Sequence, residues 1–197
     1  MPKLSTGNHF GGRMVFDGKG YLFIGLGENN QRSTAQDLDK LQGKVVRLTE
    51  QGKIPSDNPF VNQAGARPEI WSYGIRNPQG MAMNPWSEVL WLNEHGPRGG
   101  DEINVPEKGK NYGWPIATWG VNYSGFKIPE SQGEIVDGTE QPVFYWEKSP
   151  AVSGMAFYNR DTFPQWRQKL FIGALKEQDV IVLSVNGNNV TEDGRIL

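Results

Sequence analysis

One short polar loop of the sequence has the residue types of a calcium site. Residues 93–104 read Asn-Glu-His-Gly-Pro-Arg-Gly-Gly-Asp-Glu-Ile-Asn and follow an apolar, strand-like run at 89–92. The glycines and the proline let main-chain carbonyl oxygens turn toward one point, and carboxylates stand beside them. Carbonyl and carboxylate oxygens are the ligands that Ca²⁺ takes in proteins. Taken alone, such a loop is more often a solvated turn than a metal site.

The two histidines offer a candidate base. His9 lies in a glycine-rich segment just before a strand-like run. A histidine there can act as a general base, because its ordinary pKa is close to neutral. The common alternative is a histidine at the surface or in packing. A zinc site would need His9 and His95 together with a carboxylate, and no metal-ligand spacing supports it.

Two further polar clusters stand at strand ends. Arg76, in the segment 74–80, offers a planar fork of donors that suits carboxylates or quinone oxygens, and Asn77 can donate beside it. The proline that follows restricts Asn77 to an extended backbone. The alternative is a turn with a solvated arginine. Lys176 ends another strand-like run, where it can face a ligand or pair with a neighbouring acid.

Adjacent acids at Asp101 and Glu102 raise glycoside hydrolysis as another possibility. Neighbouring residues of a strand point to opposite faces, however, so this pair does not favour a shared catalytic role.

The composition narrows the class of protein. The 197 residues include 20 Lys and Arg against 22 Asp and Glu, which argues against nucleic-acid binding. No cysteine is present, so disulfides and thiolate metal sites are excluded. No apolar stretch approaches the roughly 20 residues that span a bilayer.

Short strand-like runs separated by glycine-rich turns dominate the chain. A motif of paired runs recurs after Gly12, Gly80 and Gly154 at long, uneven intervals. Such a repeat favours the blades of a β-propeller, with a β-sandwich as the alternative. We expect strand pairs at 13–16 with 21–25, 80–83 with 90–92, 154–158 with 169–173 and 44–48 with 52–54, and a strand at 180–185.

Four motifs in one order resemble a known family, the soluble aldose sugar dehydrogenases, which are relatives of soluble quinoprotein glucose dehydrogenase. The motifs are His-Phe-Gly-Gly-Arg at 9–13, Gly-Ile-Arg-Asn-Pro-Gln-Gly at 74–80, Glu-His-Gly-Pro at 94–97 with Asp-Glu-Ile-Asn at 101–104, and Asn-Tyr-Gly-Trp-Pro at 111–115. The resemblance runs from His9 to the end of the chain.

The resemblance implies an all-β fold, a six-bladed propeller of which this chain holds about three to four blades. We expect residues 1–197 to form a single, partial propeller domain, with further N-terminal blades before Met1 and a closing segment after Leu197. The family implies pyrroloquinoline quinone (PQQ) and Ca²⁺ as cofactors. It also implies oxidation of aldose sugars at the anomeric carbon, with hydride passing to the quinone.

The resemblance also implies roles for individual residues. His9 matches the general base, and the carbonyls of Gly96 and Pro97 match ligands of the catalytic calcium. Glu102 and the carbonyl of Tyr112 match ligands of a second, structural calcium. The positions that match cofactor contacts are Arg76, Asn77, Tyr123, Ala174, Leu175 and Lys176.

Some positions depart from the glucose dehydrogenases. Their acid that supports the catalytic histidine has its nearest equivalent here in Leu26 or Glu28. His95 replaces a glutamine and Ala151 a cofactor-binding threonine, which suggests looser sugar specificity.

The expected partners are aldose sugars and an external electron acceptor, in a periplasmic monomer or weak homodimer, with any signal peptide upstream of Met1. Two other functions stay open. One is a non-catalytic propeller that binds a protein or polysaccharide, and the other is a calcium-dependent lactonase.

Overall fold

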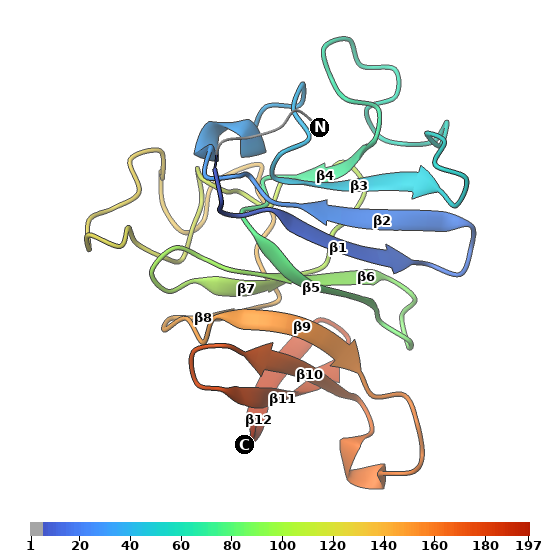
Figure 1. The fold of residues 1–197 in the computed structure, drawn as a ribbon, viewed down its shortest axis with the longest axis vertical. Helices are drawn as coiled ribbons and strands as arrows, with labels where there is room; N and C mark the ends of the chain where they lie inside the picture. Colours follow the sequence, from blue (N-terminus) through green and yellow to red (C-terminus); the bar gives the residue numbers. More distant parts are fainter. Residues whose placement is uncertain (1–5) are drawn as a thin grey trace.

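Three four-stranded antiparallel sheets stand side by side in the computed structural model, which describes residues 6–197 (Figure 1). In each sheet the strands follow one another in chain order. The first sheet holds β1 (Gly11–Phe16), β2 (Tyr21–Leu26), β3 (Lys44–Thr49) and β4 (Ile70–Tyr73). The second holds β5 (Pro78–Met83), β6 (Leu90–Glu94), β7 (Asp101–Asn104) and β8 (Phe144–Trp146), and the third holds β9 (Val152–Phe157), β10 (Lys169–Ala174), β11 (Asp179–Asn186) and β12 (Asn189–Ile196). Two 3₁₀ turns, η1 (Arg32–Ala35) and η2 (Pro164–Trp166), complete the elements.

The sheets are arranged as consecutive propeller blades. Strand β1 packs beside β5, and β5 packs beside β9, so the first strands of the three sheets are neighbours. A β-sandwich would instead place two sheets face to face. The expectation of an all-β, incomplete propeller with three to four blades is therefore confirmed, with three blades described.

Most of the expected strand pairs are present, and one is wrong. The hairpins β1–β2 and β5–β6 and the pair β9–β10 form as predicted. The run 44–48 does not pair with 52–54, because β3 already lies between β2 and β4. Residues 49–53 form only a tight turn, in which the amide of Lys53 donates to the hydroxyl of Thr49 at 3.1 Å.

The core lies between the blades. One cluster, which includes Phe23, Ile75 and Leu92, fills the space between the first and second sheets. A second cluster includes Trp91 and Leu183 and joins the second sheet to the third, and a third, smaller one holds Ala35, Trp114 and Ile128. Burying each such side chain contributes about 1.5–3 kcal/mol, so blade-to-blade packing is what fixes the loops at the strand ends.

The two ends of the strands carry different loops. At the left end in Figure 1 lie the connections 27–43, 74–77, 95–100, 147–151 and 175–178. The turns 17–20, 84–89 and 187–188 lie at the opposite, right end. We call these the left end and the right end below. No helix within residues 6–197 has the length and apolar character needed to cross a membrane.

Candidate functional site

The left end brings together predicted site residues from all three sheets. Arg76 and Asn77 come from the β4–β5 connection, and Lys176 comes from the β10–β11 turn. His9 directly precedes β1. A long excursion between β7 and β8, residues 105–143, supplies the remaining tyrosines and is drawn largely in yellow in Figure 1.

His9 is held by a buried carboxylate. Its Nδ1 makes a short hydrogen bond with Oε1 of Glu28, whose side chain is fully buried. The carbonyl of His9 accepts hydrogen bonds from the amide and the side chain of Asn29, both at 3.1 Å. Glycine is required at position 27, because a Cβ there would lie 2.0 Å from the His9 carbonyl oxygen. Of the two positions that the sequence left open, Glu28 and not Leu26 thus supports His9. Because Nδ1 faces this carboxylate, Nε2 is the ring nitrogen left to accept a proton.

Glu94 fixes the direction of the Arg76–Asn77 segment. Its Oε2 accepts the main-chain amides of Arg76 at 2.6 Å and Asn77 at 3.1 Å. The Arg76 guanidinium lies 5.1 Å from the Trp114 ring and donates to the carbonyl of His95 at 2.9 Å. Burial lowers the pKa of Arg76 and raises the pKa of Glu94 to about 7. Glu94 could be predicted from the sequence as one of the acids of the 93–104 loop. Nothing in the sequence predicted that it accepts hydrogen bonds from the main-chain amides of Arg76 and Asn77.

A second acid, which is partly buried, stands beside Glu94. Glu102 lies opposite it in the β6–β7 register, and the Asn104 side chain donates to both carboxylates, at 3.2 and 3.3 Å. Burial, followed by the charge of Glu94, raises the pKa of Glu102 well above its ordinary value. Both acids line a cavity of about 10 Å³ with Tyr112, which gives room for about one water molecule or ion. A buried and a partly buried acid side by side fit a divalent cation, because a cation would offset their desolvation and mutual repulsion.

Free carbonyl oxygens support the same assignment. The carbonyls of Gly96, Pro97 and Tyr112 accept no hydrogen bond from any residue in the range 6–197. Buried carbonyls normally find a partner, so these oxygens are available to a hard cation such as Ca²⁺. The 96–100 loop is tightly folded, since a Cβ on Gly96 would lie 2.2 Å from the Gly100 carbonyl oxygen.

An open pocket of about 770 Å³ adjoins this loop. Pro97, Tyr123 and Lys176 line it together with the cations Arg98 and Lys148. The Lys176 ammonium lies 3.4 Å from the Ser149 carbonyl and 3.6 Å from the Glu177 carboxylate. Three cations against one lining acid, Glu147, suit a ligand with several carboxylates.

The structure does not bring every predicted residue into that pocket. Arg76, Glu102 and Tyr112 line the small cavity instead, next to Gly96. Ala174 is buried in the core, and Leu175 is 61% exposed, so neither side chain lines the pocket.

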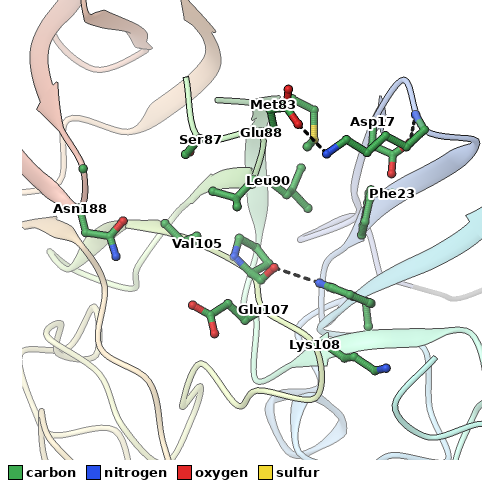
Figure 2. Close-up of a pocket in the computed structure, with 15 residues that line it drawn as sticks. Asp17, Phe23, Met83, Ser87, Glu88, Leu90, Val105, Glu107, Lys108 and Asn188 are labelled. Carbon is green, nitrogen blue, oxygen red and sulfur yellow. Dashed lines mark hydrogen bonds and ion pairs between the residues drawn. The ribbon is translucent and has the colours of Figure 1, made fainter. Parts of the chain in front are cut away.

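A second pocket, of about 540 Å³, lies at the right end (Figure 2). Its wall is apolar, with Phe23, Met83 and Leu90, and its rim carries an ion pair between Lys19 and Glu88 at 2.7 Å. None of the predicted site residues lines it. Candidate chemistry therefore belongs to the left end.

The left end of this propeller gathers a supported histidine, acids and free carbonyls. This arrangement is typical of a β-propeller that binds a ligand at one end of its strands. The sequence matches the glucose/sorbosone dehydrogenase family over residues 1–197, and the chain belongs to that family. It is 84% identical over its whole length to the aldose sugar dehydrogenase YliI of Escherichia coli, of which it spans 53%.

Solved structures agree with this assignment. The chain is similar to the soluble aldose sugar dehydrogenase of Escherichia coli in its apo-form, with a TM-score of 0.99 and 84% identity over 100% of this chain and 57% of that one. It is also similar to the PQQ-bound form of an aldose sugar dehydrogenase from Streptomyces coelicolor, with a TM-score of 0.71 and 28% identity over 94% of this chain and 49% of that one. The chain thus spans about half the length of these relatives.

Proposed function

We propose that the protein oxidises aldose sugars at the anomeric carbon to lactones, with PQQ and Ca²⁺ as cofactors. The observation that carries the proposal is the His9–Glu28 pair, a base with a buried carboxylate partner, at the same strand ends as Arg76 and Lys176. The names of the relatives, an aldose sugar dehydrogenase and a PQQ-bound one, support it.

The residues divide the work of the reaction. PQQ, when bound with calcium, supplies an electrophilic carbon that accepts the hydride from the sugar. Nε2 of His9 accepts the proton of the anomeric hydroxyl, and the Glu28 carboxylate orients the ring and stabilises its charged form. Arg76 and Asn77 would supply donors to the quinone oxygens and stabilise negative charge there.

Other residues hold the cofactors. The carbonyls of Gly96 and Pro97 would bind the catalytic calcium, while Glu102 and the carbonyl of Tyr112 would bind the second. Lys176 and Tyr123, which line one pocket, would hold the quinone. The positions of Ala174 and Leu175 leave them a main-chain role in shaping the loop before Lys176.

We also infer that the protein passes electrons to an external acceptor, is located in the periplasm and is a monomer or weak homodimer. Residues 1–197 belong to one propeller domain of which they form a part.

The test is dye reduction by the purified protein with PQQ and CaCl₂, using glucose and other aldoses as substrates. We expect sugar-dependent reduction, and His9→Ala should lower kcat by about 10²–10⁴-fold because the base is lost. No reduction and no shift in the absorbance of added PQQ would refute the proposal.

Two other outcomes would favour the alternatives. A calcium-dependent lactonase would hydrolyse lactones without added quinone. A non-catalytic propeller would keep its partner binding unchanged in His9→Ala.

A further inference from the structure

Asp101 is a fully buried acid that none of the roles above uses. It is the first residue of β7, and its side chain faces away from that of Glu102. Oδ1 accepts the main-chain amide of Gly96 at 3.0 Å. Oδ2 accepts the hydroxyl of Ser149 at 2.8 Å and the main-chain amide of Val152 at 3.1 Å. Three donors therefore converge on one carboxylate.

These donors belong to two different blades. Gly96 lies in the second blade, in the loop whose carbonyls we assign to the catalytic calcium. Ser149 lies in the connection that leads from β8 into β9, and Val152 is the first residue of β9, the first strand of the third blade. Asp101 therefore joins the two blades at the left end.

The end of the 147–151 connection in turn positions the loop that carries Lys176. The amide of Leu175 donates to the carbonyl of Ala151 at 2.9 Å, and the amide of Lys176 donates to the carbonyl of Pro150 at 3.1 Å. The Lys176 ammonium lies 3.4 Å from the Ser149 carbonyl. A short chain of hydrogen bonds thus connects Gly96 to Lys176 through Asp101.

The chemistry of the site requires a carboxylate of this length. All three partners of Asp101 are donors, and a carboxylate has acceptor positions on both oxygens. Asparagine would turn an amide N–H₂ toward one of these donors and leave it unsatisfied. Glutamate would add a methylene group where the side chain is already fully buried.

We propose that Asp101 is the positioning residue that sets the spacing between the calcium-binding carbonyls and Lys176. The inference rests on the proposed function for the identity of the ligands. Asp101 itself touches neither ligand. Its loss would let the 95–100 loop and the 147–151 connection move apart, and affinity for both calcium and quinone would fall together.

The test uses Asp101→Asn, Ser149→Ala and the double variant. We expect Asp101→Asn to weaken PQQ binding in the presence of calcium by at least about tenfold. The binding is measured by tryptophan fluorescence. Ser149→Ala removes one of the three donors and should weaken binding about two- to fivefold. The double variant should match Asp101→Asn alone, because the hydroxyl acts through the carboxylate and the two effects are not additive.

Asn58→Ala is the matched control for lost stability. Its side chain is buried in the first blade and donates to the carbonyls of Arg47 at 3.0 Å and Pro68 at 2.9 Å. We expect this variant to melt at a lower temperature but to bind PQQ like the wild type. Equal losses of affinity in Asn58→Ala and Asp101→Asn would overturn the inference, and so would wild-type affinity in Asp101→Asn.

A measurement without ligands separates this inference from the proposed function. Amide hydrogen exchange at Gly96, Val152 and Lys176 should accelerate in Asp101→Asn and not in Asn58→Ala. Unchanged exchange at these amides would overturn the positioning role even if PQQ binds. If Asp101→Asn does not fold, Ser149→Ala carries both measurements, with faster exchange at Val152 as the supporting result.

Discussion

Acidic side chains behave differently at the two ends of the strands. At the left end Glu28, Glu94 and Asp101 are buried and hold histidine or main-chain N–H groups. At the right end Glu88 is exposed and pairs with the equally exposed Lys19 above an apolar pocket (Figure 2). The buried acids thus fix loops at the left end, whereas Glu88 belongs to a solvated rim at the right end.

Burial decides whether a carboxylate fixes the position of a loop. A buried carboxylate needs hydrogen-bond partners, and those of Glu28, Glu94 and Asp101 lie at the left end, so each acid holds the segment that supplies its donors. An exposed ion pair is screened by water and salt and dictates little. Variants at both ends of the strands test this difference.

The largest effect we expect is a pH-dependent loss of stability from Glu94 in the metal-free protein. Its pKa is raised from 4.5 to about 7. Between these values the folded protein retains a proton that the unfolded chain releases, so the free energy of unfolding falls as pH rises through this window. The loss is on the order of 3 kcal/mol, measured by urea unfolding at pH 5 to 8.

Calcium and a neutral variant provide the controls. Added CaCl₂ should restore stability at pH 8, because the ion binds the ionised acids of the folded state only. Glu94→Gln should show a shallower pH slope, with Glu102 still titrating. A slope in Glu94→Gln equal to that of the wild type would contradict the assignment.

Replacing Glu28 by Gln should lower the rate of sugar oxidation about 100-fold, with a smaller change in KM. Gln keeps an oxygen near Nδ1 of His9 but loses the negative charge that stabilises the protonated ring. Steady-state dye reduction measures both constants. Glu88→Gln makes the same chemical change at the right end and should leave them unaltered, whereas equal effects would erase the contrast between the ends.

The smallest effect concerns the rim of the right-end pocket. Lys19→Ala breaks the ion pair with Glu88, and both side chains are more than half exposed. We expect the melting temperature to stay within experimental error of the wild type, at low and at high salt. A clear salt-sensitive drop would mean that this rim is also an anchor.

The sequence predicted the blades better than the anchors. Glycine-rich turns and alternating apolar runs are local signals, so β1–β2, β5–β6 and β9–β10 could be expected from residues that lie close together in the chain. The pairing of 44–48 with 52–54 was wrong, because β3 finds its second partner in β4 after a long connection. Nothing local in the sequence marks that choice.

The candidate site shows the same limit. The resemblance pointed to His9, Arg76 and Lys176 but left Leu26 and Glu28 both open as support for the histidine. The partners of Glu94 are main-chain amides in the β4–β5 connection, and those of Asp101 extend to Val152. A main-chain amide has no residue type, so no motif reveals such a contact before the blades are packed.

The excursion of residues 105–143 has a consequence for protein engineering. Its two ends are fixed by a pair in the sheet, with Ile103 opposite Phe144. Exchanging this segment for one from another family member costs little extra loop entropy. Tyr112, Trp114 and Tyr123 lie within it, so such a transplant would change the walls of the small cavity and of the open pocket, together with the ring that Arg76 faces. The His9–Glu28 pair lies outside the segment and would stay.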